Sequence, residues 1–335
     1  MTLKIAINGF GRIGRLALRS ILETPRKNIQ IVAINDLSSP EICAHLLQYD
    51  TLHGPLGMRC TATQSSLKVG RHTIKVFNEK DPAALPWDKL DIDIVLECTG
   101  FFTSREASSA HLAAGARKVL ISAPGENADL TVVYGVNHNK LKKTHTIVSN
   151  ASCTTNCLAP VAQTLHKTCG ITRGYMTTIH AYTGDQKLAD ATHKDLRRAR
   201  AATQSIIPTT TGAAQAIGQV LPELAGRLEG SALRVPVPNV SLVDLVVQTK
   251  KATSVDEINN AMIRAAKTNL KGVLGVCDAP LVSSDFNHNP LSSIFDLSHT
   301  QMVNTRMVRI LSWYDNEWGF ANRMLDTAAQ MGRLL

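Results

Sequence analysis

The chain has 335 residues, a formal net charge of +9 and seven cysteines. This length suffices for two domains, and the content of 4% aromatic against 44% hydrophobic residues predicts aliphatic cores, as in buried parallel strands. The odd number and the spacing of the cysteines favour neither a disulfide framework nor a metal cluster, which indicates a reducing compartment. The amino terminus lacks the apolar core of a signal peptide, and no apolar run approaches the length of a membrane span, so we expect a cytoplasmic protein.

The positive charge makes nucleic-acid binding an alternative to be weighed. The densest basic run, KDLRRAR, lies at residues 194–200. No stacking aromatics are interleaved with it, and the sequence contains no recognisable nucleic-acid-binding motif. A solvated basic face or a site for small anions such as phosphate would also account for the charge.

The first predicted elements surround a glycine-rich turn. A short buried strand at 4–8 runs into GFGRIG at 9–14 and then into a helix with apolar residues at helical spacing. In this context a GxGxxG motif indicates dinucleotide binding, because Gly9, Gly11 and Gly14 let the backbone approach a pyrophosphate at a helix N-terminus. The next strand, 30–35, ends at Asp36, which lies 22 residues past the last glycine. A carboxylate there can accept hydrogen bonds from a ribose diol and would repel a 2′-phosphate, so NAD is the default cofactor.

Alternation of strands and helices continues along the first half of the chain. Helices are predicted to begin at 38–41, with a capping box and a proline, and at 103–106, and strands at 93–97, 118–122 and 145–148. This alternation predicts an α/β fold with a doubly wound parallel sheet. Beyond Cys169 the pattern predicts an α+β second domain with a helix at 255–267 and extended segments at 171–182, 231–235, 240–249, 294–297 and 307–313, before a terminal helix at 318–331.

The run SNASCTTNC at 149–157 is the strongest candidate for a catalytic site. Cys153 lies where the strand at 145–148 gives way to a helical pattern, and Ser152 is a good N-cap. An ordinary thiol of pKa about 8.5 is only about 3% thiolate at pH 7, but a helix N-terminus and nearby cations can lower that pKa and produce a nucleophile. The alternative is a cysteine that only packs, a role that fits Cys157, one turn later, better than Cys153.

Six motifs in order resemble those of phosphorylating (type I) glyceraldehyde-3-phosphate dehydrogenases: INGFGRIGR, SNASCTTNC, HAYT, IIPTTTGAA, RVPVPNVS and WYDNEWGF. The resemblance covers nearly the whole chain. It implies a Rossmann-type NAD(P)-binding domain at 1–151, completed by a C-terminal helix at 316–335, and a catalytic domain with a mostly antiparallel sheet at 152–315. It also implies a homotetramer that acts in glycolysis or gluconeogenesis.

The implied reaction converts glyceraldehyde 3-phosphate to 1,3-bisphosphoglycerate. Cys153 would add to the aldehyde to form a hemithioacetal, with His180 as the base and later the acid. Hydride transfer to NAD would leave a thioester, which inorganic phosphate cleaves. The resemblance places the substrate phosphate near Thr183, Arg198 and Arg234, although Arg197 and Arg200 are close alternatives to Arg198. It places the attacking phosphate near Ser152, Thr154, Thr211 and Gly212.

For the cofactor, the resemblance implies contacts from Arg12, Ile13, Asp36, Lys80, Ser122 and Asn316. One departure concerns residues 191–192, which are Ala-Thr where members restricted to NAD commonly have Leu-Pro. Photosynthetic relatives that accept NADP have small residues there. We therefore hypothesise NAD use with additional acceptance of NADP, against which Asp36 argues electrostatically.

Two alternative functions remain open at this point. Erythrose-4-phosphate dehydrogenase shares the glycine turn, the cysteine motif and a run like DFNHNP at 285–290, although HAYTGDQ and PTTTGAA match the glyceraldehyde enzyme better. A nucleic-acid or surface-binding protein is the alternative of another class. It predicts binding that weakens steeply with salt.

Overall fold

The computed structural model describes residues 2–335, which divide into two compact units. Unit 1 contains the residues up to Tyr134 together with 138–152 and 321–335, and unit 2 contains 135–137 and 153–320. The domain bounds expected from the sequence, 151/152 and 315/316, compare with 152/153 and 320/321 for these units. Among residues 2–335, no helix combines the length and apolar character needed to cross a bilayer.

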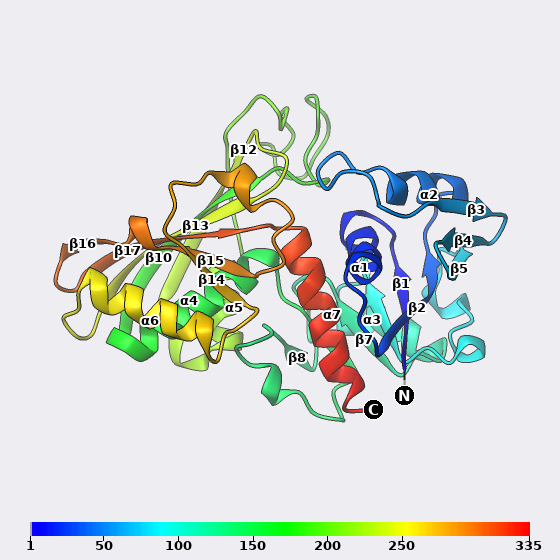
Figure 1. The fold of residues 1–335 in the computed structure, drawn as a ribbon, viewed down its shortest axis with the longest axis horizontal. Helices are drawn as coiled ribbons and strands as arrows, with labels where there is room; N and C mark the ends of the chain where they lie inside the picture. Colours follow the sequence, from blue (N-terminus) through cyan, green and yellow to red (C-terminus); the bar gives the residue numbers. More distant parts are fainter. Residues whose placement is uncertain (1) are drawn as a thin grey trace. The chain divides into compact units, whose positions relative to one another are not determined.

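Unit 1 is built on a nine-stranded sheet with the order β3-β4-β5-β2-β1-β6-β7-β9-β8 (Figure 1). Neighbouring strands from β5 to β8 are parallel, whereas β3, β4 and β5 form an antiparallel meander at one edge. The strands are β1 (Leu3–Asn8), β2 (Ile29–Asn35), β3 (Cys60–Thr63), β4 (Ser66–Val69), β5 (His72–Phe77), β6 (Ile94–Glu97), β7 (Lys118–Ile121), β8 (Leu130–Thr131) and β9 (Ile147–Ser149).

The parallel strands of unit 1 are buried on both faces, which explains their aliphatic composition. Ile7 of β1 packs toward α1 (Arg12–Glu23), where Gly14 leaves room for it. Its neighbour Ala6 belongs to a cluster on the opposite face with Ala33, Val95 and Trp87. Helices α2 (Pro40–Gln48) and α3 (Arg105–Ala113) complete the unit with the part of α7 (Trp318–Gly332) that follows residue 320. The doubly wound α/β prediction is confirmed.

Unit 2 is built on an eight-stranded mixed sheet with the order β11-β12-β10-β13-β17-β15-β14, and β16 pairs with β17. The pairs β10/β12 and β14/β15 are parallel and the others are antiparallel, as expected for a mostly antiparallel sheet. The strands are β10 (Ile171–Ala181), β11 (Ile207–Thr209), β12 (Leu228–Val235), β13 (Ser241–Thr249), β14 (Leu274–Cys277), β15 (Ser293–Asp296), β16 (Gln301–Asn304) and β17 (Met307–Tyr314).

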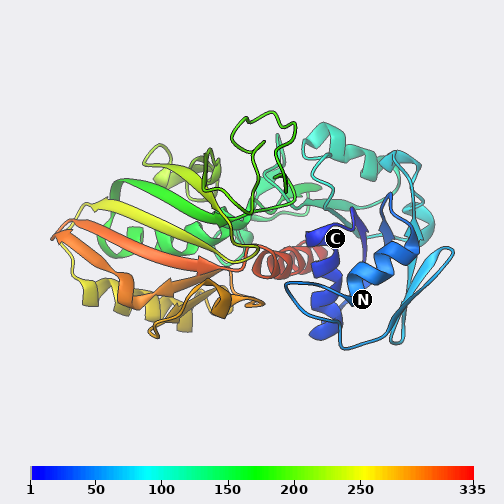
Figure 2. The ribbon, with the colours of Figure 1, turned by 90° about the horizontal axis from the view of Figure 1, so that it is seen from above.

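Three helices cover one face of this second sheet: α4 (Cys153–Cys169), α5 (Ala213–Val220) and α6 (Val255–Lys267). Figure 2 shows the strands of this sheet side by side, with helices along it. Because side chains alternate along a strand, Met176, Thr178 and His180 of β10 are buried on one face while Tyr175 is exposed on the other. The alternation therefore turns His180 toward the helix-covered face.

The sequence patterns did not predict the antiparallel meander at residues 60–77. Its strands are short and half exposed, so they carry little apolar alternation for a sequence pattern to detect. Strand β14 was missed for the same reason of length. The helix predicted at 255–267 is confirmed at those bounds. Short 3-10 turns occur at η1 (Pro82–Ala84), η2 (Asp88–Leu90), η3 (His138–Lys140), η4 (Pro222–Leu224), η5 (Ser283–Phe286) and η6 (Leu297–His299).

Candidate active site

The candidate nucleophile occupies the first residue of a helix. Strand β9 ends at Ser149, and α4 begins at Cys153 after a turn in which Ala151 has φ of 56°. A left-handed backbone is unfavourable for a residue with a Cβ and is often found at functional sites. Cys153 is partly exposed, whereas Cys157 is buried and its Sγ lies 3.7 Å from the Ser312 carbonyl oxygen, which it faces as a donor.

Cys153 and His180 form a pair. The Sγ of Cys153 lies 3.5 Å from Nε2 of His180. The other ring nitrogen, Nδ1, lies 2.7 Å from the carbonyl oxygen of Ala181 and 2.7 Å from Nη1 of Arg234. When Nδ1–H donates to Ala181, the lone pair of Nε2 faces the sulfur and can accept its proton.

The electrostatics of this pair differ from the sequence-based expectation. Burial raises the pKa of the Cys153 thiol, and the positive charge of Arg234 only partly opposes this. The prediction of a lowered thiol pKa is therefore wrong for this arrangement, because desolvation of the sulfur outweighs the neighbouring cation. Burial, followed by the charge of Arg234, lowers the pKa of His180 to about 3. The resting pair is consequently a neutral thiol beside a neutral imidazole.

Tyr314 is a residue of the site that sequence reasoning missed. Its hydroxyl lies 2.8 Å from the hydroxyl of Thr154 in α4 and 2.9 Å from that of Thr178 in β10. Its ring meets the His180 ring edge-on, with centroids 6.0 Å apart. Alternation along 307–314 would have predicted that Tyr314 faces inward. The phenol thus links the helix that carries Cys153 to the strand that carries His180.

The structure separates the three arginines that the sequence left as alternatives. Arg198 acts electrostatically on both His180 and Arg234. Its guanidinium is oriented by Asp185, 2.8 Å from Nη1, and by the hydroxyl of Thr209, 3.0 Å from Nε. Arg200 instead pairs with Asp190 at 2.7 Å, and Arg197 is exposed. Arg198 is therefore the member of the basic run that the structure brings toward the pair.

Arg234 projects from β12, the neighbour of β10. Its Nη1 donates to the Ala181 carbonyl oxygen at 2.9 Å. Within residues 2–335, its buried Nε has no hydrogen-bond partner. A buried guanidinium N–H without an acceptor fits an anionic ligand.

The remaining predicted phosphate residues lie on turns and helix starts of unit 2 or just before it. Gly212 precedes α5 without a side-chain cap, and the hydroxyl of Thr211 accepts from the N–H of Ala213 at 3.2 Å. Thr183 follows β10 and is partly buried, as is Ser152 beside Cys153. The hydroxyl of Thr154 is hydrogen-bonded to that of Tyr314, so we expect Thr154 to contact an anion through its backbone N–H.

Four of the predicted dinucleotide residues, Gly9, Gly11, Asp36 and Lys80, line a cavity of about 350 Å³ in unit 1. Gly9 has φ of +88°, and a Cβ there would lie 2.7 Å from the backbone nitrogen of Thr99, so only glycine fits. Both carboxylate oxygens of Asp36 accept backbone N–H groups, from Phe10 at 2.7 Å and from Ser38 at 2.9 Å. The cavity is lined by Asn8, Gly9, Gly11, Asn35, Asp36, Leu37, Glu79, Lys80, Cys98, Thr99, Phe101 and Phe102.

Other predicted cofactor residues lie outside that lining. Arg12 forms a bidentate contact with Asp50, at 2.5 and 3.2 Å, and Ile13 follows it in α1. Ser122 follows β7 and donates its N–H to the Glu97 carbonyl oxygen at 2.9 Å. In unit 2, Oδ1 of Asn316 accepts from the hydroxyl of Ser241 at 2.8 Å, which fixes the orientation of that amide.

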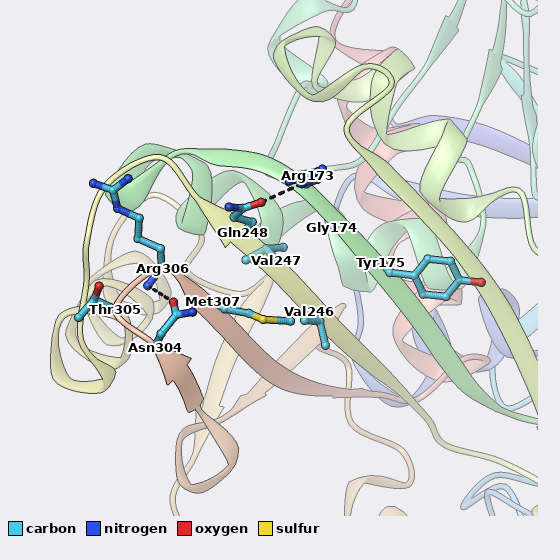
Figure 3. A pocket seen from close by; sticks show the side chains of 10 residues that line it. All are labelled: Arg173, Gly174, Tyr175, Val246, Val247, Gln248, Asn304, Thr305, Arg306 and Met307. Carbon is cyan, nitrogen blue, oxygen red and sulfur yellow. Dashed lines mark hydrogen bonds between the residues drawn. The ribbon is translucent and has the colours of Figure 1, made fainter.

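Another cavity, of about 630 Å³, lies elsewhere in unit 2. Figure 3 shows its lining from β10, β13 and the β16–β17 turn, with Tyr175, Gln248 and Met307 around it and Arg173 bonded to Gln248. None of its lining residues is a cysteine or a histidine. It therefore offers no nucleophile or base for the chemistry described above.

Comparisons with known proteins agree with this geometry. Residues 3–105 match the family described as glyceraldehyde 3-phosphate dehydrogenase, NAD binding domain, and residues 152–316 match the corresponding C-terminal domain. Glyceraldehyde-3-phosphate dehydrogenase of Xanthobacter flavus is 60% identical over 334 residues, covering 100% of both chains. The enzymes of Pseudomonas aeruginosa and Geobacillus stearothermophilus are 60% and 52% identical, each over 98% of both chains. The chain therefore belongs to the glyceraldehyde-3-phosphate dehydrogenase family.

Proposed function

We propose that this protein catalyses the oxidative phosphorylation of glyceraldehyde 3-phosphate to 1,3-bisphosphoglycerate with NAD. The observation that carries the proposal is the 3.5 Å approach of Cys153 Sγ to His180 Nε2, with Arg234 against the other ring nitrogen. A thiol needs a nearby base to add to an aldehyde, and this imidazole is neutral and in reach.

The reaction begins with proton transfer from Cys153 to Nε2 of His180 as the sulfur adds to the aldehyde carbon. The alkoxide that results takes this proton back from the imidazolium, which gives a neutral hemithioacetal on Cys153 and a neutral imidazole. Its hydroxyl proton passes to the same imidazole when the carbon is oxidised and a thioester forms. NAD, when bound, supplies the acceptor for the hydride that leaves this carbon. Inorganic phosphate then attacks the thioester, the C–S bond breaks, and the thiolate of Cys153 regains a proton from the imidazolium of His180.

Arg234 and Arg198 hold the substrate phosphate in this proposal, with Thr183 beside them. The free Nε of Arg234 and the fork of its guanidinium suit a dianionic oxygen cluster. The N-terminus of α5 at Thr211 and Gly212, with Ser152 and Thr154, holds the attacking phosphate. Helix N-terminal N–H groups favour an anion there.

We propose that NAD occupies the cavity beside the glycine turn. Gly9, Gly11, Arg12, Ile13 and Gly14 serve the pyrophosphate, Asp36 serves the adenosine ribose and Lys80 lies near the adenosine. Ser122 and Asn316 act at the nicotinamide end. In this assignment unit 1 is the NAD-binding domain, completed by α7, and unit 2 is the catalytic domain.

Use of NADP is a second proposal about the same cavity. It rests on the resemblance, in which small residues at 191–192, here Ala and Thr, accompany acceptance of NADP, whereas the Asp36 carboxylate, held by two backbone N–H groups, opposes a 2′-phosphate. The ratio of specificity constants for the two cofactors decides the matter. A preference for NAD beyond about a thousandfold, on the order of 4 kcal/mol, eliminates NADP.

We also propose a homotetramer in the cytoplasm. The sheet face of unit 2 opposite its helices carries exposed Tyr175 and Met307, and the loop from 187 to 203 carries exposed Leu188 and Leu196. Apolar surface of this kind is typical of subunit contacts. A cytoplasmic location suits a reaction that requires a reduced Cys153. Light scattering tests the assembly, and a monomer at micromolar concentration contradicts it.

The activity is tested by following cofactor reduction with glyceraldehyde 3-phosphate, with and without inorganic phosphate. We expect phosphate-dependent turnover that Cys153→Ser abolishes and that His180→Asn lowers by roughly 10²–10⁴. Erythrose 4-phosphate serves as the rival substrate. Faster turnover of that aldehyde, or turnover that ignores phosphate, would replace the proposed reaction with another.

A further inference from the structure

A network of buried polar side chains lies at the cofactor end of unit 1 and takes no part in the chemistry above. Its members come from the carboxyl ends of the adjacent parallel strands β2, β1 and β6 and from the neighbouring segments of the chain. All are at most partly exposed, and five have 5% exposure or less. They are Asn8, Asn35, Trp87, Glu97, Thr99 and His111.

Glu97 is the centre of this network. Its Oε2 accepts from Nδ2 of Asn8 at 2.6 Å and lies 3.0 Å from Nε2 of His111. Its Oε1 accepts from the backbone N–H of Thr99 at 2.7 Å and also from the Thr99 hydroxyl. Four donors therefore converge on one carboxylate that is 1% exposed.

The donors that Asn8 and His111 present to Glu97 are fixed by their other partners. The indole N–H of Trp87 can only donate, and it donates to Nδ1 of His111 at 3.1 Å. The proton of a neutral His111 ring therefore sits on Nε2, from which it is donated to Glu97. On the other side, Oδ1 of Asn8 accepts from Asn35 at 2.7 Å, so the Asn8 amide cannot turn over. Asn35 and Trp87 therefore fix the orientations of Asn8 and His111, the two side chains that donate to Oε2 of Glu97.

Glu97 joins the two segments that border the dinucleotide cavity. Asn8 immediately precedes Gly9, and Thr99 begins the loop that continues to Phe101 and Phe102. The two segments touch, because a Cβ on Gly9 would lie 2.7–2.8 Å from backbone atoms of residues 98 and 99. The Thr99 hydroxyl also accepts the N–H of Phe101 at 3.0 Å.

We propose that Glu97, oriented by His111, is a positioning residue that sets the spacing between the glycine turn and the 99–102 loop and thereby the affinity for the dinucleotide. This inference rests on the proposed NAD use of the cavity. Neither side chain is among the residues that line the cavity, so both act through Asn8 and Thr99. Loss of their bonds should weaken cofactor binding and leave the chemistry at Cys153 intact.

Glu97→Gln provides the first test. The substitution keeps the size of the side chain but replaces one acceptor with an NH2 group, which meets the donors on Asn8 or Thr99. We expect the Kd for NAD, measured by isothermal titration calorimetry without substrate, to rise about tenfold or more. At saturating NAD, kcat should stay within about threefold of its original value. Glu106→Gln, an exposed acid in the first turn of α3, is the matched control and should bind NAD normally.

A pair of His111 variants tests the same idea where Glu97→Gln fails to fold. Glutamine offers an acceptor to Trp87 and a donor to Glu97, whereas leucine offers neither. We expect His111→Gln to keep the NAD Kd within about threefold and His111→Leu to raise it about tenfold. If His111 had a purely structural role, both variants would have a lower Tm and both would bind NAD with the same Kd.

The outcomes are distinguishable. Unchanged NAD affinity in Glu97→Gln and His111→Leu, even with a lower Tm, overturns the inference. Weakened NAD binding in a protein that fails to oxidise glyceraldehyde 3-phosphate would sink the proposed reaction while supporting the positioning role. Equal NAD affinity in His111→Leu and His111→Gln would also overturn the inference that His111 and Glu97 are positioning residues.

Discussion

Nη1 of Arg234 lies 2.7 Å from Nδ1 of His180, while Nε2 of the same ring lies 3.5 Å from Cys153 Sγ. A guanidinium N–H can only donate, so Arg234 favours the tautomer with the proton on Nε2. The Ala181 carbonyl oxygen, also 2.7 Å away, favours the proton on Nδ1 and leaves Nε2 free to act as a base. A substrate phosphate that draws the guanidinium toward itself therefore favours the tautomer that catalysis needs.

Substituting Arg234 should change both substrate affinity and pH dependence. Burial and then the charge of Arg234 lower the pKa of His180 to about 3, so protonation of this base does not limit turnover above about pH 4. Arg234→Gln removes the repelling charge, which raises the pKa of His180 and moves the acid limb of the kcat profile to higher pH. Loss of a charged contact to phosphate should raise KM for glyceraldehyde 3-phosphate about a hundredfold.

Steady-state kinetics between pH 4 and 9 check this prediction. Arg200→Gln is the control, because Arg200 forms an exposed pair with Asp190 and should leave both quantities unchanged. An acid limb that stays in place in Arg234→Gln would contradict the assigned influence of Arg234 on His180.

Two of the three cysteines of α4, Cys153 and Cys157, should react at different rates. Burial raises the pKa of the Cys157 thiol to about 12, and its sulfur is fully buried. The pKa of Cys153 is also raised by burial, but Arg234 opposes the shift and the residue is partly exposed. Because the thiolate is the reactive species, iodoacetamide should label Cys153 first and at a rate that increases with pH. Peptide mass spectrometry of a time course measures this, and earlier labelling of Cys157 would refute it.

Removing one hydroxyl should test the link between Cys153 and His180. Tyr314→Phe leaves the buried hydroxyls of Thr154 and Thr178 without their common partner, which should cost about 1–3 kcal/mol of stability. It should also lower kcat, because the start of α4 and the strand that carries His180 lose their bridge. Tyr175→Phe removes an exposed phenol from the same sheet and is the control. Thermal unfolding and kcat equal to those of Tyr175→Phe would show that the bridge has no effect.

The elements that could be predicted from the sequence are those with a strong local pattern. The glycine turn, the strands buried on both faces and the start of α4 at Cys153 carry signals that act over a few residues, and each was found. His180 was identified through its motif, and the alternation of β10 explains why it is buried toward the helices. The meander at 60–77 was missed because its strands are short and half exposed.

Contacts between residues far apart in the chain, and the burial of individual side chains, could not be predicted from one sequence. Tyr314 and Thr154 are 160 residues apart, and no local pattern pairs them. The pKa of Cys153 was predicted with the wrong direction because the helix N-terminus is visible in the sequence, whereas the burial that dominates it is not. Glu97 and His111 were overlooked for a related reason, since a strand end and a helix face meet only in the folded unit.

The ion pair between Arg12 and Asp50 makes a pH-dependent contribution to stability. Burial would raise the pKa of Asp50, but hydrogen bonds from Arg12 and from the backbone N–H groups of His53 and Leu52 lower it to about 2. A carboxyl with a lowered pKa stabilises the fold at pH values above its ordinary pKa, and this contribution is lost as the pH falls toward 2. One pKa unit corresponds to about 1.4 kcal/mol, and Arg12 is one-third exposed, so screening leaves about 1 kcal/mol. Asp50→Asn should therefore lower the free energy of unfolding by about 1 kcal/mol at pH 7, and the difference should shrink between pH 4 and pH 2. Urea denaturation at several pH values measures this difference in the free energy of unfolding. Asp91→Asn is the control, because the pair of Asp91 with Lys4 is exposed. A difference that persists unchanged at pH 2 would mean that Asp50 acts through packing and not through its charge.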